Sequence, residues 1–146
     1  MNIAGIDYNL NQRALEVYLS GCDGLCKGCH NQKLWDFDTG YNAFGSIFNH
    51  ILQKLNKDMV QYLWIMGGEP LQQDPQALWV FLDTISHYSN TFIMLWTREY
   101  EEGIPRDIKK YLKYAKVGEY REDSESYIEP LFGVELASTN QRIIRL

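Results

Sequence analysis

The sequence has few of the residues that mark several large classes of protein. Lysine and arginine number 14 and acidic residues 19, so the formal net charge is −5. A free-standing nucleic-acid-binding protein is usually basic, and that class is therefore disfavoured. No apolar run approaches the roughly 20 residues that span a bilayer, and the first residues lack the basic and then apolar pattern of a secretory signal. We therefore expect a cytoplasmic protein with no nucleic-acid or membrane partner.

Cysteine is also scarce, because the chain has only three. Cys22, Cys26 and Cys29 follow the spacing Cys-x3-Cys-x2-Cys. The cytoplasm keeps thiols reduced, so a close group of this kind indicates a metal site before a disulfide. Iron–sulfur clusters are usually held by four cysteine thiolates. Three thiolates would leave one iron open to a non-protein ligand, and an open iron suits catalysis more than simple electron carriage.

A zinc site is the alternative interpretation, with His30 as the fourth ligand. His30 directly follows Cys29 in the sequence, and adjacent residues bind one tetrahedral ion awkwardly. No second cysteine or histidine pair lies nearby in the sequence to complete a conventional zinc finger. The sequence therefore favours an iron–sulfur cluster over zinc. A non-enzymatic module that binds zinc or an iron–sulfur cluster remains an alternative interpretation.

The rest of the chain alternates short apolar runs with segments of helical periodicity. The expected strands are 14–20, 60–66, 91–96 and 115–120, and the expected helices are 44–55, 75–88 and one that opens at Pro105 and extends to Ala115. Asp74 is the expected N-cap of the second helix. This alternation predicts an α/β fold with a mainly parallel sheet and flanking helices. A chain of 146 residues suits one domain, 1–146, and four or five strands cannot close an eight-stranded barrel. We therefore expect one domain built as an open partial (β/α) barrel.

Residues 67–71, Gly-Gly-Glu-Pro-Leu, come directly after the expected strand 60–66. Two glycines there let a ligand approach the backbone closely, and Glu69 offers a carboxylate to a cationic group. Pro70 stiffens the turn. The alternative is an ordinary turn with an exposed glutamate. Right-handed crossovers bring the carboxyl ends of parallel strands to one edge, so this segment and the cysteines are expected to share the edge where α/β folds place their chemistry.

The two segments together resemble the motifs of the radical S-adenosylmethionine (SAM) family. The resemblance rests on Cys22-x3-Cys26-x2-Cys29 followed by Gly67-Gly68-Glu69-Pro70. Within that family the sequence is most similar to the activating proteins of anaerobic (class III) ribonucleoside-triphosphate reductase. The segments that carry this likeness are 19–36, 67–73, 95–100 and 138–144.

The resemblance implies two cofactors and the residues that hold them. A 4Fe–4S cluster would bind to Cys22, Cys26 and Cys29, and SAM would chelate the fourth iron. Residues 67–70 would contact the methionine part of SAM. Gly28 stands where many members of the family carry an aromatic residue, so His30 becomes a candidate for stacking on the adenine.

The resemblance also implies an activity and its partners. SAM would be cleaved reductively to methionine and a 5′-deoxyadenosyl radical, which would take a hydrogen atom from a glycine of the partner. That partner would be the large subunit of anaerobic ribonucleotide reductase, and flavodoxin or ferredoxin would donate the electron. A radical SAM enzyme that acts on a small molecule, such as a deazapurine-forming enzyme, is the alternative.

The sequence departs from the family pattern at two further strand ends. Residues 97–100 read Thr-Arg-Glu-Tyr where the family tends to have Thr-Gly-Tyr, and residues 117–120 read Val-Gly-Glu-Tyr where an aspartate-rich end is usual. Arg98 is expected to cap a helix at the surface, and a contact with SAM or substrate is the alternative.

Overall fold

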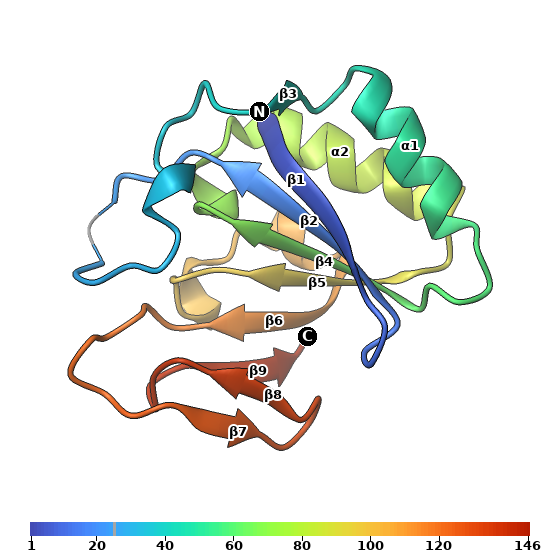
Figure 1. Ribbon diagram of the computed structural model, residues 1–146. Helices are drawn as coiled ribbons and strands as arrows, with labels where there is room; N and C mark the ends of the chain where they lie inside the picture. The colour runs from blue at the N-terminus through green and yellow to red at the C-terminus, as the bar shows by residue number, and fades with distance from the viewer. Residues whose placement is uncertain (25) are drawn as a thin grey trace.

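A seven-stranded sheet forms the centre of the molecule, in the order β3-β1-β2-β4-β5-β6-β9 (Figure 1). The computed structural model describes residues 1–24 and 26–146. The parallel strands of the sheet are β2 (Ala14–Ser20), β4 (Tyr62–Gly67), β5 (Phe92–Trp96) and β6 (Leu112–Val117). The antiparallel strands at the two edges are β1 (Asn2–Asn9), β3 (Tyr41–Asn42) and β9 (Arg142–Arg145).

Three helices make the crossovers between the parallel strands. They are α1 (Ser46–Leu55), α2 (Pro75–Tyr88) and α3 (Arg106–Lys109). Short 3₁₀ turns occupy η1 (Gln32–Leu34), η2 (Pro70–Gln72) and η3 (Glu101–Gly103). The predicted cap of α2 is confirmed, because the Asp74 carboxylate accepts a hydrogen bond from the Ala77 N–H at 2.7 Å. Within the described residues, no helix combines the length and apolar character that a bilayer span requires.

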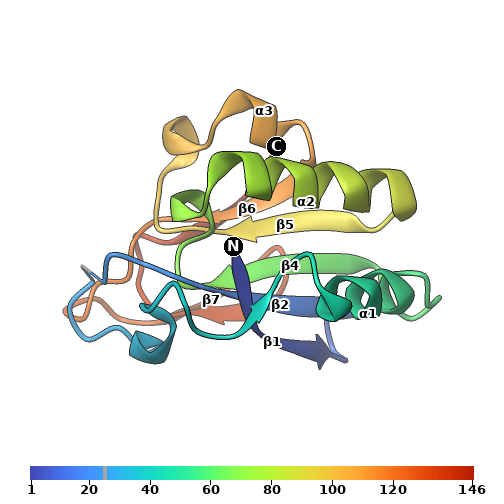
Figure 2. The ribbon, with the colours of Figure 1, turned by 90° about the horizontal axis from the view of Figure 1, so that it is seen from above.

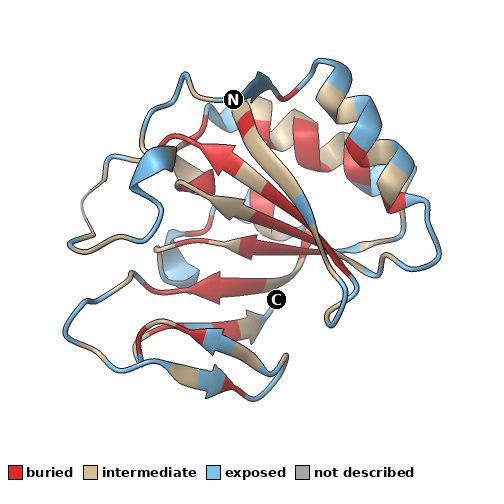
Figure 3. Cartoon of the chain, in the orientation of Figure 1, coloured by how far each residue is buried: buried red, intermediate tan, exposed pale blue. Residues whose placement is uncertain are grey.

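The two faces of the sheet are covered differently. Alternate residues of the central strands, such as Val17, Ile65 and Leu95, pack with Phe81 of α2 and with residues of α1 and α3 in the main core. The opposite face packs against the hairpin of β7 (Tyr127–Glu129) and β8 (Val134–Leu136). Figure 2 shows α2 and α3 on one side of the strands and β7 on the other. Figure 3 shows that buried residues dominate the central strands, whereas the loop that follows β2 is largely half-buried or exposed.

The structure supports the α/β class and corrects parts of the expected architecture. The four central strands are parallel as predicted, but the sheet edges are antiparallel, and an open barrel is not confirmed. The long helix expected from Pro105 to Ala115 is wrong, because α3 ends at Lys109 and the chain then enters β6. Pairing of β6 with β5 and β9 outweighs the helical spacing of the apolar residues in this segment.

Candidate active site

The four parallel strands end at one edge of the sheet, where they surround a pocket of about 250 Å³. Cys22 follows β2, Gly67 ends β4, Arg98 follows β5 and Lys116 lies near the end of β6. The expectation that the cysteines and the Gly-Gly segment share one edge is therefore confirmed. The pocket lining that bears on chemistry is Cys22, Cys26, Cys29, His30, Gly67, Gly68, Glu69, Thr97, Arg98, Lys116, Tyr120 and Gln141.

The cysteine loop, residues 22–29, carries three free, half-buried thiols. Two backbone hydrogen bonds hold the start of this loop against the end of η1. The Gly21 N–H donates to the Leu34 carbonyl at 2.7 Å, and the Cys22 N–H donates to the Trp35 carbonyl at 3.1 Å. The Gly24 N–H donates to the Cys22 sulfur at 3.5 Å. Burial raises the pKa of the Cys22 thiol, while the Gly24 N–H and the Arg98 charge oppose that rise. Backbone N–H groups directed at sulfur are suited to a thiolate ligand.

The three thiols line one pocket. Among the described residues, no group of three or more His, Cys, Asp or Glu side chains is placed to hold one metal ion. A tetrahedral zinc site needs ligands that converge on one point. A 4Fe–4S cluster has its thiolates on different iron atoms, so its ligands surround a larger volume. Three half-buried thiols that line one pocket are compatible with the second arrangement.

The two glycines of the Gly-Gly segment lie where β4 approaches the end of β2. Gly67 has a φ of +115°, and a Cβ atom at this position would come within 2.2 Å of the Leu19 carbonyl oxygen. A Cβ atom on Gly68 would come within 2.3 Å of the Gly21 carbonyl oxygen. The glycines are therefore required by the close approach of two backbones, in addition to any need of a ligand.

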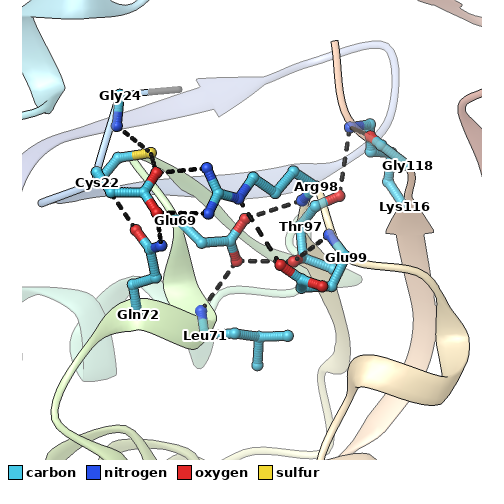
Figure 4. Close-up of polar contacts among 11 residues, drawn as sticks. Cys22, Gly24, Glu69, Leu71, Gln72, Thr97, Arg98, Glu99, Lys116 and Gly118 are labelled. Carbon is cyan, nitrogen blue, oxygen red and sulfur yellow. Dashed lines mark hydrogen bonds and ion pairs between the residues drawn. The ribbon is translucent and has the colours of Figure 1, made fainter. Parts of the chain in front are cut away.

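Glu69 joins the ends of β4 and β5. Its carboxylate accepts hydrogen bonds from the Thr97 hydroxyl at 2.7 Å, the Arg98 N–H at 2.8 Å and the Leu71 N–H at 3.0 Å (Figure 4). The residue is only 1% exposed, so the alternative of an exposed glutamate in an ordinary turn is wrong. Burial raises the pKa of Glu69, and the three hydrogen bonds oppose that rise. Pro70 is buried in η2 and is not among the described residues that line the pocket.

Arg98 contacts the cysteine loop instead of capping a helix at the surface. Its guanidinium donates to both carboxylate oxygens of Asp23, at 2.5 and 2.7 Å. Gln72 binds the same carboxylate with its side-chain N–H at 2.6 Å and accepts the Asp23 backbone N–H at 2.9 Å. The hydrogen bond to Asp23 raises the pKa of Arg98 above its ordinary value, so the guanidinium stays charged.

Lys116 is a buried cation on β6, with 8% of its surface exposed. Its ammonium donates to the Gly118 carbonyl at 2.9 Å and to the Thr97 carbonyl at 3.4 Å. Burial lowers the pKa of Lys116 from 10.5 to about 8, while the charges of Glu69 and Cys26 act in the opposite direction. Lys116 was not among the residues predicted for the site, although a lysine inside the expected apolar strand 115–120 was a usable signal.

The wall of the pocket beyond β6 is held by the C-terminal segment 138–144. The His30 and Tyr120 rings lie with their centroids 4.8 Å apart, and both line the pocket. The side chains of Asn140 and Gln141 donate to the carbonyls of Glu119 and Gly118 at 2.9 and 3.3 Å. The tail therefore fixes the backbone next to Tyr120, a role that sequence spacing alone could not reveal.

Together these features describe an α/β protein with a three-cysteine pocket at the carboxyl edge of its parallel strands. The chain belongs to the 4Fe-4S single cluster domain family, whose model matches residues 12–144. Membership in this family supports an iron–sulfur cluster in the chain.

Individual relatives carry one common name. The chain is 28% identical over 105 residues to the anaerobic ribonucleoside-triphosphate reductase-activating protein of Haemophilus influenzae, covering 69% of this chain and 68% of that protein. It is 27% identical over 112 residues to the protein of the same name in Enterobacteria phage T4, covering 73% of this chain and 70% of that protein. It is 37% identical over 68 residues to the protein of the same name in Pasteurella multocida, covering 45% of this chain and 42% of that protein. No solved structure gave a significant match.

The buried position of Lys116 predicts a pH dependence of stability in the protein without its cofactors. Because its pKa is about 8 in the folded chain and near 10.5 when exposed, the unfolded chain binds more protons between these values. The free energy of unfolding should therefore rise across this window, by roughly 3 kcal/mol at most from this group. Lys116→Met should lack that rise in urea unfolding measured from pH 7.5 to 10.5.

The control for this experiment is Lys113→Met, which removes a half-exposed lysine from the same strand. Subtracting its pH profile corrects for the loss of one positive charge. Parallel profiles for the wild type and Lys116→Met would show that Lys116 does not titrate as described.

Proposed function

We propose that this chain is a radical SAM activase that generates a glycyl radical on anaerobic ribonucleotide reductase. The observation that carries the proposal is one pocket lined both by the three cysteines and by Gly67, Gly68 and Glu69. The names of the relatives and the matched family support an activating role and an iron–sulfur cluster.

Cys22, Cys26 and Cys29 are the proposed ligands of a 4Fe–4S cluster. They are the only cysteines of the chain, so one iron would have no cysteine ligand. When bound, the cluster supplies the electron for reductive cleavage of SAM and an open iron that SAM chelates. The protein contributes the half-buried setting of the thiols and the N–H groups directed at the Cys22 and Cys29 sulfur atoms.

The proposed SAM contacts lie along the rest of the pocket wall. The backbone of Gly67 and Gly68 borders the pocket, and the buried Glu69 carboxylate supplies negative charge toward the methionine ammonium. Pro70 begins the η2 turn, in which the Leu71 N–H binds Glu69, so its proposed role is to position this segment.

Two further residues are proposed to contact SAM, one at its methionine carboxylate and one at its adenine base. The two hydrogen bonds of the Lys116 ammonium occupy two of its three protons, which leaves one donor for the methionine carboxylate among the described contacts. His30 offers an aromatic face for the adenine, and Tyr120 lies against it. Both rings replace the missing aromatic residue at Gly28.

The proposed partner is the large subunit of anaerobic ribonucleotide reductase, with flavodoxin or ferredoxin as electron donor. In the overall reaction, one electron and SAM enter, a hydrogen atom leaves the glycine Cα, and methionine and 5′-deoxyadenosine are released. The pocket must therefore admit a protein segment as well as SAM. Its position at the sheet edge, beside the exposed part of the cysteine loop, is compatible with such access.

Anaerobic reconstitution with iron and sulfide tests the cofactor assignment. We expect about four iron and four sulfide per chain, and 5′-deoxyadenosine after addition of SAM and a reductant. Cys29→Ser should lose the product and most of the iron. Purified protein that holds zinc without sulfide, or a reconstituted cluster that forms no 5′-deoxyadenosine, would contradict the proposal.

His30→Gln separates the stacking role from a zinc-ligand role. Loss of one aromatic contact to a base should weaken SAM binding about tenfold, with the iron content unchanged. His50→Gln, on the exposed part of α1, is the matched control. Equilibrium binding of SAM to the reconstituted protein measures the change, and loss of the metal in His30→Gln would favour the zinc site.

A further inference from the structure

Asp23 connects the cysteine loop to two strand ends. It lies between the first two cysteines, and its carboxylate is bound by Arg98 after β5 and by Gln72 in η2 after β4. Gln72 also accepts the Asp23 backbone N–H, so it fixes both the side chain and the main chain of this residue. The cysteine loop is therefore attached to the same edge of the sheet as Glu69.

The geometry of this contact makes it stronger than an ordinary surface ion pair. Arg98 presents a two-pronged donor to both oxygens of Asp23, and the side chains of the two residues are 20% and 40% exposed. Bidentate, partly shielded pairs of this kind are the strong ones. A second described ion pair of the loop, Lys27 with Glu122, has side chains 91% and 51% exposed. Pairs that are so exposed contribute little.

The same arginine also belongs to the Glu69 network. Its backbone N–H donates to the Glu69 carboxylate at 2.8 Å, while its guanidinium binds Asp23. A displacement of Arg98 would therefore affect the cysteine loop and the end of β4 together. This coupling places the loop in a defined position relative to the Gly-Gly segment.

The cysteine loop has a particular need for such a restraint. Gly24 and Gly28 have φ values of +70° and +72°, and glycine backbones lose more conformational freedom on ordering than those of other residues. A side-chain contact at Asp23, near the start of the loop, limits the conformations that the loop explores before any ligand binds. Pre-organisation of this kind favours binding because less freedom is lost in the binding step.

We propose that Asp23, Gln72 and Arg98 form a loop clamp, which holds the cysteine loop in the conformation that receives the cluster. The three are positioning residues, since none of them is a proposed ligand. The clamp rests on the proposed function, because the cluster is what the loop would hold.

The experiment compares Arg98→Lys, Asp23→Asn and the double variant with the wild type. Arg98→Lys keeps the positive charge but loses the bidentate contact. Hydrogen exchange of the protein without cofactors should become about tenfold faster in residues 20–24, with residues 78–85 of α2 as an internal reference. Iron release from the reconstituted protein to a ferrous chelator should accelerate by a similar factor. The double variant should show less than the product of the two single effects, because both substitutions weaken the shared Arg98–Asp23 contact.

Glu122→Gln is the matched control, because it removes an exposed ion pair from the same loop. It should exchange and release iron at close to the wild-type rate. If the wild type binds a cluster but the clamp variants behave like this control, the clamp is overturned and the proposed function stands. Equal acceleration in α2 would also overturn the clamp, because the effect would then be a general loss of stability. A wild-type chain that binds no iron–sulfur cluster would overturn both.

Discussion

One buried carboxylate connects the parts of the sheet edge on which the site is built. Glu69 accepts hydrogen bonds from the Thr97 hydroxyl and from the N–H groups of Leu71 and Arg98. A carboxylate that is removed from water is costly unless such donors compensate it, and here all three come from the protein. The end of β4, the turn after it and the end of β5 therefore form one unit, and the remaining pocket residues are arranged around that unit.

The cysteine loop depends on this unit through several contacts at close range. Gly67 and Gly68 allow the end of β4 to touch the backbone of β2, directly before the first cysteine. The Glu69 N–H donates to the Gly21 carbonyl at 2.9 Å, and the Gln73 side chain donates to the Ser20 and Gly21 carbonyls. Sequence segments almost 50 residues apart therefore meet through backbone contacts, while the charged groups Arg98 and Lys116 stand at the following two strand ends.

Much of this arrangement was predictable from the sequence, for identifiable reasons. The strands 14–20 and 91–96 are strongly apolar, and α2 has a clear N-cap, so periodicity located them. β1 was not predicted, because its sequence contains a glycine, an aspartate and two asparagines without a regular apolar alternation. The segment after Pro105 was assigned to a helix because Ile108, Tyr111, Leu112 and Ala115 follow helical spacing. Residues 112–117 form a strand because they pair with β5 and β9, and such pairing cannot be recognised from the spacing of apolar residues.

Some residues of the candidate site were predicted from the sequence, and others were found only in the structure. The cysteines and the Gly-Gly segment were found because each is a local pattern, and parallel topology placed them at one edge. The Asp23–Arg98 contact, the position of Lys116 and the role of Asn140 and Gln141 depend on pairs of residues far apart in the sequence. No periodicity or spacing encodes such pairs, so they required the structure.

The central claim is that this pocket activates another protein. The most direct measurement is the electron paramagnetic resonance spectrum of anaerobic ribonucleotide reductase from the same source, after incubation with the reconstituted chain, SAM and a reductant. We expect a glycyl radical signal on the reductase that requires every component. A reductase that shows no radical, while 5′-deoxyadenosine forms, would contradict the activase assignment.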